Sequence, residues 1–189
     1  MFIRIVDESL ERLIRTELAM GDDLGDVAFD APTSNWSAQL SRITVNLFLY
    51  DVAMSGHPSR TPIRRVMEDG TAERRAPQPL IQLSYLVSAW AGTARDEHQL
   101  LGDLVSRLCG HPTMPPEHIT GELSSSVYLG ICVDEQNRLR DIWSAAGGHL
   151  KASFTLQASV AADAHDWQAA APLVRSVEAL VPPMPGGRG

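Results

Sequence analysis

The chain has 189 residues, of which 44% are hydrophobic and 21% charged, so it has the composition and length of one ordinary globular domain that needs no disulfide or metal to fold. Its net charge of −7 excludes a generally basic protein that coats nucleic acid. Only one of its 16 basic residues, Lys151, is a lysine, which excludes any mechanism that requires two lysines.

The N-terminal segment is predicted to form an amphipathic helix. Apolar residues recur at spacings of three and four from Ile3 to Leu18, and Gly21 is expected to end the helix in a left-handed conformation. A short strand is predicted at residues 27–30 and a stronger one at residues 43–50. Because the second strand carries apolar side chains on both faces, both faces are expected to be covered.

Residues 53–78 have no sustained hydrophobic period and contain several glycines and prolines, which is typical of a long loop. This segment concentrates arginine, at Arg60, Arg64, Arg65, Arg74 and Arg75. Five arginines against three acidic residues give it a charge of +2, which leaves −9 for the rest of a chain of net charge −7. Arginine pairs with carboxylates and is enriched in interfaces, so one hypothesis is that these residues dock on an acidic protein surface. A solvated loop and a nucleic-acid contact are the alternatives.

A long strand is predicted over residues 80–91, where side chains alternate in character. A helix is predicted to follow it, with Thr93 or Asp96 as its N-cap. The inward stripe of this helix is predicted to contain Glu97, His98, Leu101, Leu104, Val105 and Leu108.

Three further elements are predicted in the second half of the chain, namely a strand over 127–133, a short helix over 139–146 and a half-exposed strand over 150–160. The whole order predicts a single α+β domain over residues 1–164, with one mixed β-sheet flanked by helices. Residues 165–189 are predicted to be an extended C-terminal segment with a flexible end.

Catalytic motifs are missing from the sequence. It contains no phosphate-binding loop, no Gly-x-Gly-x-x-Gly, no Gly-x-Ser-x-Gly and no His-Glu-x-x-His. The strongest acid–base or metal-binding candidate is the run Asp96-Glu97-His98. Adjacent helical positions point in different directions, so this run is interpreted as a structural helix N-terminus, and no cofactor is predicted.

The tryptophans Trp36, Trp90 and Trp143 each stand in an apolar context and are interpreted as anchors of a core or an interface, not as a base-stacking platform. Cys109 and Cys132 are expected to be buried, reduced thiols. The N-terminus has no signal-peptide pattern, and no run of about 18 apolar residues is present to span a membrane. A cytoplasmic protein is therefore expected.

Three segments together suggest a family. They are residues 45–52, residues 79–91 continuing through 96–102 into the helix that reaches Leu108, and residues 142–145 followed by a strand. In combination they resemble the N-terminal domain of the cap, or tail-terminator, proteins of extracellular contractile injection systems, which are phage-tail-like particles. The resemblance covers roughly residues 1–180.

The resemblance implies a structural role and no enzymatic activity. Such caps are similar to phage tail terminators, which form a hexameric ring on the end of the inner tube distal to the baseplate. The implied partners are the inner tube protein, the sheath protein and further copies of the chain, without nucleic acid, in a particle assembled in the bacterial cytoplasm. The residues expected to form the structural core or the family motif are Trp36, Asn46, Tyr50, Tyr85, Trp90, Glu97, His98, Leu101 and Trp143.

Alternatives remain at this point. Within the same kind of particle, the chain is alternatively a cap adaptor beneath the terminal cap. From a different class, a small hydrolase with a loop-borne site would use His98 and Asp96, since loops often carry function. A nucleic-acid-associated regulator would instead use the arginine-rich segment.

Overall fold

The computed structural model describes residues 2–56, 62–132 and 138–170. The chain divides into two compact units, the first formed by residues 1–59 and 78–164 and the second by residues 60–77 and 165–189. Each unit contains its own β-sheet. The first sheet is mixed and flanked by helices, which confirms the predicted α+β class, and the second sheet is small.

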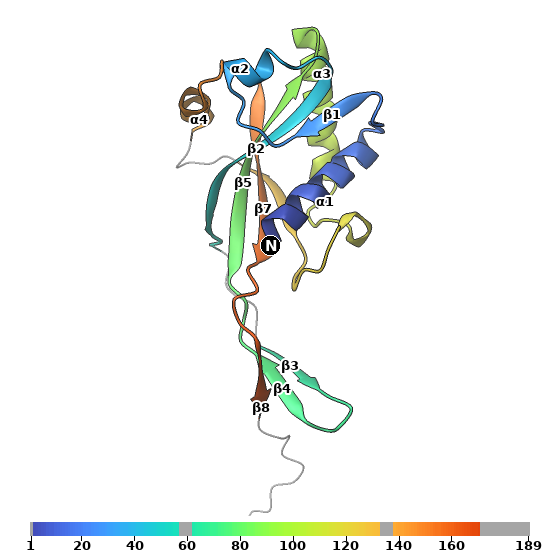
Figure 1. Ribbon diagram of the computed structural model, residues 1–189, viewed down its shortest axis with the longest axis vertical. Helices are drawn as coiled ribbons and strands as arrows, with labels where there is room; N and C mark the ends of the chain where they lie inside the picture. Colours follow the sequence, from blue (N-terminus) through green and yellow to red (C-terminus); the bar gives the residue numbers. More distant parts are fainter. Residues whose placement is uncertain (1, 57–61, 133–137, 171–189) are drawn as a thin grey trace, which may run out of the picture. The chain divides into compact units, whose positions relative to one another are not determined.

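The sheet of the first unit has the strand order β1-β2-β5-β7-β6 (Figure 1). In that order the strands are Gly25–Ala28, Ile43–Met54, Leu80–Trp90, Ser153–Ala161 and Tyr128–Cys132. β1 runs parallel to β2, whereas the other neighbouring strands are antiparallel. The central strand β5 is long and almost entirely buried, as expected for a strand with a covered surface on both sides.

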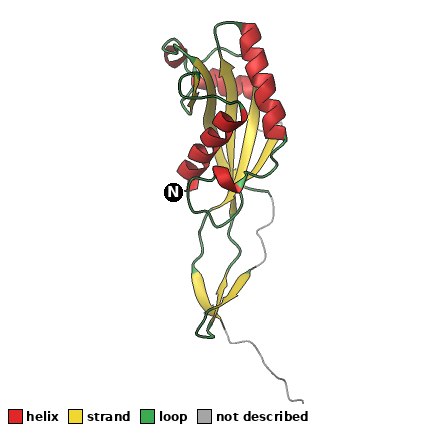
Figure 2. Cartoon of the chain, turned by 90° about the vertical axis from the view of Figure 1, so that its right-hand side faces the viewer, coloured by secondary structure: helices red, strands yellow, loops and turns green. Residues whose placement is uncertain are grey.

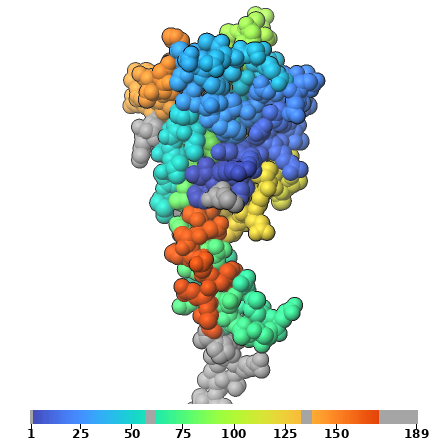
Figure 3. All heavy atoms as spheres, in the orientation of Figure 1, coloured from blue at the N-terminus to red at the C-terminus, as the bar shows by residue number. Residues whose placement is uncertain are grey.

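One face of this sheet is covered by the two long helices α1 (Phe2–Glu17) and α3 (Ala94–Cys109) (Figure 2). The N-terminal segments, coloured blue in Figure 3, make up much of the visible surface of this unit. Helices and sheet share one core of buried side chains, including Val6, Leu10, Leu13, Val45, Leu47, Leu83, Val87, Leu104 and Leu108. Burying each such side chain contributes about 1.5–3 kcal/mol, so this layer is the main core of the unit.

The ends of these helices follow from local hydrogen bonds. α1 ends at Glu17, and the residue with a left-handed backbone is Ala19 (φ 49°), not Gly21, so the predicted glycine cap is wrong. α3 begins after Thr93, whose hydroxyl oxygen accepts a hydrogen bond from the backbone N–H of Asp96 at 3.2 Å. The Thr93 alternative for the N-cap is therefore confirmed.

The opposite face of the sheet is covered by α2 (Ser34–Ser37) and α4 (Leu139–Ala146). α4 places Ile142 and Trp143 against Leu86 of β5 in a second, smaller cluster of buried residues. Both faces of the central strands are thus covered, in agreement with the expectation for residues 43–50.

Two glycines close α4 and join it to α2. Gly147 has a left-handed backbone (φ 72°), as a helix-ending glycine should. Its carbonyl oxygen accepts hydrogen bonds from the backbone N–H and the hydroxyl of Ser34, at 3.3 and 3.1 Å. At Gly148 a Cβ would lie 2.2 Å from the carbonyl oxygen of Pro32. Only glycine permits this close approach of two backbones.

The three tryptophans form one cluster on the α4 side of the sheet. The Trp36 and Trp90 ring centroids are 5.4 Å apart, and those of Trp90 and Trp143 are 6.2 Å apart. Trp90 Nε1 donates to the hydroxyl of Ser88 at 3.1 Å, and Trp143 Nε1 donates to the hydroxyl of Ser153 at 3.0 Å. Because both indole N–H groups have partners, burying them carries no unpaired-donor penalty.

The second unit is a three-stranded antiparallel sheet with the order β3-β4-β8. Its strands are Ile63–Val66, Ala72–Arg75 and Trp167–Ala170. The prediction of a long loop over 53–78 is therefore wrong, because β2 continues to Met54 and β3 and β4 form a hairpin. All four residues of β3 are exposed, so this strand has no buried face and its sequence shows no alternation of polar and apolar residues.

The strand β7 also differs from its prediction. It begins at Ser153, not at residue 150, and Leu150 is 65% exposed. A half-exposed strand over residues 150–160 would place Thr155 and Ser159 on its solvated face, but both are buried. α4 and the neighbouring strands cover the polar side that an isolated amphipathic strand would expose.

The two cysteines differ in how far they are exposed. Cys109, the last residue of α3, is exposed and Cys132 is half-buried, so the prediction of buried thiols is wrong for Cys109. Helix ends lie at the surface, and an apolar sequence context does not reveal this.

Residue 133 and residues 171–189 lie outside the described part of the chain.

Candidate docking surface

The hairpin formed by residues 63–75, which we call the arginine hairpin, turns through Met67–Thr71. The backbone N–H of Met67 donates to the carbonyl of Thr71 at 2.9 Å, and Gly70 has φ +80°, a conformation that favours glycine. Asp69 Oδ1 accepts from the hydroxyl and the backbone N–H of Thr71, at 2.6 and 2.9 Å. These bonds hold the pKa of Asp69 below its ordinary value of 3.8 and fix the turn.

On one face of the second sheet, arginines hold the strands together. The guanidinium of Arg65 lies 2.7 Å from the carboxylate of Glu73 and stacks on Trp167 of β8, with 4.1 Å between the guanidinium carbon and the ring centroid. Arg75 Nε donates to the backbone carbonyl of His165 at 2.6 Å. An exposed ion pair and an exposed cation–π contact each contribute up to about 1 kcal/mol, so these two arginines serve the sheet itself.

The other face of this sheet presents arginine outward. Arg64 lies directly opposite Arg74 across the β3–β4 ladder, and Gln168 lies opposite Arg74 on β8. Both arginines are exposed, and like charges at directly opposed positions destabilise a sheet. Val66 shares this face and is 57% exposed. The result is a basic surface with an apolar neighbour.

The five arginines predicted as a protein interface thus fall into different groups. Arg64 and Arg74 form the outward face, whereas Arg65 and Arg75 bind the strands to one another. Arg60 lies outside the described residues. Docking on an acidic protein surface stays a prediction, and it now concerns Arg64 and Arg74 alone. Sequence reasoning missed Trp167, although a tryptophan in a polar stretch, outside any apolar period, is a usable signal for such a contact.

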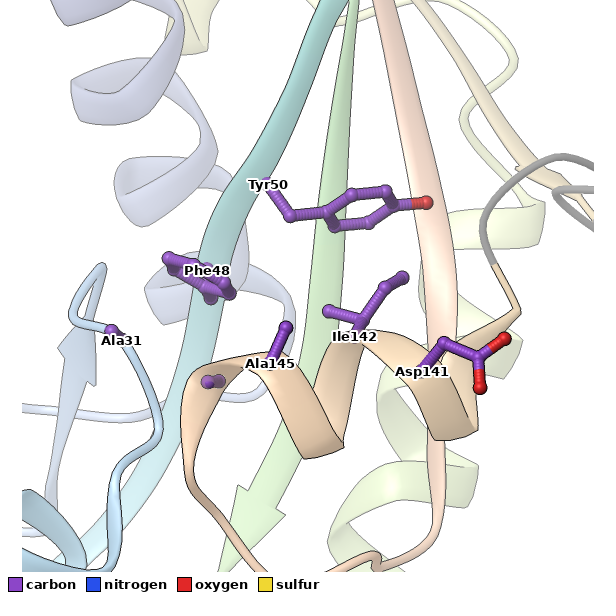
Figure 4. A pocket seen from close by; sticks show the side chains of 7 residues that line it. Ala31, Phe48, Tyr50, Asp141, Ile142 and Ala145 are labelled. Carbon is purple, nitrogen blue, oxygen red and sulfur yellow. The ribbon is translucent and has the colours of Figure 1, made fainter.

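A groove on the first unit lies between β2 and α4 (Figure 4). Its volume is about 570 Å³, within the usual range of ligand pockets. Its lining residues are Ala31, Phe48, Tyr50, Asp141, Ile142, Ala145 and Ala146. Figure 4 shows the Phe48 and Tyr50 side chains projecting from β2 above α4, with Asp141 at one end of the groove. The groove is mainly apolar and carries a carboxylate.

A β-bulge shapes the β2 side of this groove. The β2–β5 register shifts between Leu49 and Asp51, so that Tyr50 is an extra residue in β2. Asp51 pairs with Ser84, which lies on the α4 side of β5, and Tyr50 lines the groove on that side too. The Tyr50 hydroxyl lies 3.2 Å from Oγ1 of Thr155. The bulge therefore presents an aromatic and an acidic residue in succession to the same side.

The single lysine, Lys151, contacts one acidic and one aromatic side chain of the same unit. Lys151 Nζ lies 2.6 Å from Glu97 Oε1 and 3.7 Å from the ring centroid of Trp90. The side chains of Lys151 and Glu97 are only 18% and 20% exposed. This pair connects the first turn of α3 with the segment before β7, which agrees with a structural reading of Glu97.

Asp96 and His98, the other two residues of the run Asp96-Glu97-His98, do not form an acid–base or metal-binding site. Asp96 accepts a hydrogen bond from the Thr93 hydroxyl at 2.8 Å, and both Asp96 and His98 are exposed. His98 therefore does not contribute to the core. Among residues 2–56, 62–132 and 138–170, no group of three or more His, Cys, Asp or Glu side chains is arranged to hold a metal ion.

The remaining residues of the expected family motif lie in the first unit. Tyr85 is fully buried, and its hydroxyl donates to Oδ1 of Asp7 at 2.7 Å. Burial raises the pKa of Asp7, an effect that the Tyr85 hydrogen bond partly offsets. Asn46 is buried and donates to the carbonyl of Asp30 at 3.0 Å, and Leu101 is half-buried. These hydrogen bonds connect elements within the first unit and form no reactive site.

A mixed five-stranded sheet between two helical layers, together with a small three-stranded sheet, defines a protein of the α+β class. The chain belongs to the family described as the Pvc16 N-terminal domain, whose model matches residues 5–176.

Two solved structures have a similar fold. One is the cryo-EM structure of the PVC sheath/tube terminator of an extracellular contractile injection system in its extended state, with 20% identity, a TM-score of 0.63 and 96% of this chain covered. The other is the cryo-EM structure of the anti-feeding prophage cap, the AFP tube terminating cap, with 15% identity, a TM-score of 0.59 and 93% of this chain covered.

The match covers 64% and 60% of those two chains, so this chain spans less than two thirds of their length. A comparison with curated proteins gave no match. In the described ranges, none of the helices has the length and apolar character needed to cross a membrane.

Proposed function

We propose that the chain is a cap, or terminator, at the distal end of the inner tube of a contractile injection particle, where it ends tube growth and joins tube to sheath. The observation that carries this proposal is the family match over residues 5–176, together with a fold like that of a sheath/tube terminator and a tube terminating cap over nearly the whole chain.

A terminator must have two different faces, one that binds the end of the tube and one that does not allow the tube to grow further. A tube of stacked rings grows by heterologous contacts, and each added ring offers a new face for the next. A terminator binds the last ring on one side and offers no equivalent face on the other. We propose a hexameric ring, as the resemblance to phage tail terminators implies. A covered sheet gives each subunit a rigid body, and exposed surfaces such as the arginine hairpin serve the contacts.

The proposed partners are the inner tube protein, the sheath protein and further copies of the chain, within a particle assembled in the cytoplasm. The outward pair Arg64 and Arg74 is the proposed contact with an acidic protein surface. Arginine suits this role because its planar fork binds carboxylates in a bidentate manner. Nucleic acid is not proposed as a partner, since the first unit carries a net charge of −9.

The test is deletion of the gene, followed by electron microscopy of purified particles. Tubes of uncontrolled length or sheaths detached from the tube end are expected, and the wild-type gene supplied in trans should restore uniform particles. Particles of normal length and stability after deletion would refute the proposal. Particles that keep a terminal density but lose the layer beneath it would identify the chain as the cap adaptor instead.

A further inference from the structure

We propose that residues 173–181 of one copy add an extended strand to the open edge of β2 in a neighbouring copy, so that the ring closes by head-to-tail contacts. The inference rests on the proposed function in one respect, the expectation that copies of the chain form a ring. It names the surface and the segment by which one copy holds the next.

The outer edge of β2 is covered along only part of its length. β1 pairs with residues 43–46 of β2, and this register ends where Ala28 lies opposite Asn46. Among the residues that the structure describes, no strand pairs with this edge from Leu47 to Met54. Figure 1 shows this part of β2 as the outer strand of its sheet. Eight residues of a strand span about 26 Å, so the open edge is long enough to pair with a whole strand.

The backbone of this edge is oriented to pair with a further strand. The backbone N–H of Ser55 donates to the carbonyl of Leu80 at 2.8 Å, and hydrogen-bonded and non-hydrogen-bonded pairs alternate along an antiparallel ladder. Val52 and Met54 therefore occupy non-hydrogen-bonded positions of the β2–β5 ladder, and their backbone groups face away from β5. Backbone groups that point outward from a sheet are a template for another chain.

Apolar side chains accompany the open edge on both faces of the sheet. On one face, Val52 and Met54 are 50% and 66% exposed, and their partners in β5 belong to the core under α1 and α3. On the other face, Phe48 and Tyr50 line the groove beside α4 (Figure 4). A strand added here would bury apolar side chains on both sides of the sheet. In strand addition, such side-chain contacts supply specificity and the backbone hydrogen bonds supply affinity.

Apart from the bulge at Tyr50, the open edge lacks the features that usually keep a strand edge unpaired. Natural proteins protect such edges with lysine, with proline or by making the strand very short. Residues 47–54 contain no lysine and no proline, and Asp51 is their one charged residue. An edge of this kind is expected to be covered in the assembled protein.

The C-terminal segment has the composition of a strand that suits this edge. β8 ends at Ala170, nineteen residues follow it, and the family match extends among them to residue 176. Prolines at 172 and 182 bound a stretch of nine residues without proline, and proline cannot donate to a strand ladder. Nine residues are close to the eight of the open edge. The large apolar residues of this stretch, three of them valines that favour strands, are Leu173, Val174, Val177, Leu180 and Val181.

The order of these residues also fits an edge that is apolar on both sides. Alternate side chains of an extended chain point to opposite faces. One face of the added strand would carry Leu173, Val177 and Val181, and the other would carry Val174 and Leu180. Each face therefore supplies apolar side chains to the residues that flank the open edge of β2.

A ring favours this contact over direct pairing of two β2 edges. Two open edges that pair about a two-fold axis use the same surface twice, and the assembly ends at a dimer. A segment that leaves one copy and an edge that receives it on the next are different surfaces, and every copy has one of each. Contacts of this kind continue from copy to copy until the ring closes.

The first experiment changes the edge and is read out by sedimentation velocity and negative-stain microscopy of the purified full chain over a range of concentrations. The wild type should form rings. Val52→Lys/Met54→Lys should weaken self-association at least about tenfold, because two apolar contacts are lost. The matched control Leu24→Lys/Leu150→Lys makes the same change at side chains that are 61% and 65% exposed and should leave the rings intact. Thermal unfolding checks that both variants fold, and rings that persist in the first would overturn the proposed edge.

The second experiment changes the segment without any change of charge. Alternate N–H groups of an added strand face its partner, so either residue 174 or residue 177 must donate to β2. Val174→Pro/Val177→Pro removes both donors and should abolish the rings. Gly186→Pro/Gly187→Pro is the matched control, since it introduces two prolines beyond the segment and should leave the rings intact. Rings in the valine variant would contradict the segment as the occupant.

Mixing the two defective variants tests the direction of the contact. Val52→Lys/Met54→Lys keeps an intact segment and Val174→Pro/Val177→Pro keeps an intact edge, so an equimolar mixture can form one contact for each pair of chains. A one-to-one dimer that does not grow further is the expected product. If the mixture stays monomeric while the wild type forms rings, the segment does not bind the edge of a second copy.

Hydrogen exchange distinguishes docking on a neighbouring copy from docking within one copy. Protection of the amides of Val52, Met54 and residues 173–181 should increase with protein concentration as rings form. Protection of the segment in a chain that is still monomeric would show that the segment binds its own copy, and this result would overturn the inference.

Further outcomes separate this inference from the proposed function. A wild-type chain that stays monomeric at all concentrations overturns the contact between copies. Intact rings in Val52→Lys/Met54→Lys, combined with lost binding to the purified tube or sheath protein, also overturn it and assign the edge to another protein. In both cases the role as a terminator still stands, because that role is decided by the deletion phenotype.

Discussion

The two units of the chain are stabilised by different means. The first unit has fully buried side chains on both faces of its sheet, gathered in two clusters. In the second unit, Ala72 is the one buried residue among the described residues of β3, β4 and β8. Its strands are connected by ladder hydrogen bonds, an ion pair and a cation–π contact. The first unit therefore buries most of the apolar surface that stabilises the chain, while the second leaves most of its side chains exposed.

The largest expected effect contrasts two tryptophans, one in each unit. Trp143→Ala removes a side chain that is 1% exposed and should lower the free energy of unfolding by about 3–5 kcal/mol. Trp167→Ala removes the surface on which Arg65 stacks and should change the main unfolding transition by less than about 1 kcal/mol. Chemical denaturation of the full chain measures both values. Equal losses would show that Trp167 contributes as much stability as the buried Trp143 and would contradict the contrast between the two units.

The next effect uses two glycines of the first unit. A Cβ at Gly148 would clash with the carbonyl of Pro32, whereas at Gly130 of β6 a Cβ meets no atom within 4 Å. Gly148→Ala should therefore destabilise the chain by about 1–3 kcal/mol through overpacking. Gly130→Ala is the matched control and should be neutral or slightly stabilising, because it lowers the entropy of the unfolded chain. Thermal unfolding distinguishes the two, and a harmless Gly148→Ala would mean that α2 and α4 are not tightly joined.

Much of the first unit was predictable from periodicity. α1, β5, α3 and α4 were placed correctly because their buried residues repeat with the period of a helix or a strand. The prediction for β7 gave the wrong first residue and left its polar face exposed. That face is covered by elements that are distant in sequence, which a local pattern does not reveal. The Tyr50 bulge was missed for a similar reason, because a bulge exists only relative to the register of a partner strand.

The second unit was not predictable in the same way. β3 and β4 expose most of their residues, so hydrophobic alternation is absent, and the glycines and prolines around them indicated a loop. β8 pairs with β4 across a sequence separation of more than 90 residues, which no local pattern reveals. Counting arginines drew attention to this segment, but the count did not show which side chains point outward. Only the register separated Arg64 and Arg74 from the arginines that bind the strands.

The smallest expected effect compares two carboxylates whose pKa values shift in opposite directions. In the first unit, burial raises the pKa of Asp7, which accepts a hydrogen bond from Tyr85. Burial and the adjacent carboxylate also raise the pKa of Tyr85 far above its usual value, so this hydroxyl keeps its proton and remains the donor. In the second unit, hydrogen bonds from Thr71 lower the pKa of the exposed Asp69.

The sign of each effect on stability follows from proton binding. The folded state binds the Asp7 proton more tightly than the unfolded chain, so its contribution to stability falls as pH rises from 3.8 through the raised pKa. Asp7→Asn keeps an acceptor for Tyr85 and removes the buried charge. It should therefore be more stable than the wild type at neutral pH, by less than about 1 kcal/mol because solvent screens the half-buried carboxylate, and the difference should vanish below pH 3.8.

Asp69→Asn should show the opposite trend, because the folded state there favours the ionised form and its contribution is lost as pH falls through the lowered pKa. Urea denaturation of both variants and the wild type at a series of pH values gives the comparison, and NMR titration of the two carboxyl groups gives their pKa values directly. An Asp7 pKa at or below 3.8 would show that the Tyr85 hydrogen bond outweighs burial. The Asp7→Asn advantage at neutral pH would then be absent, and Asp7 would resemble Asp69 in stabilising the fold through its charged form.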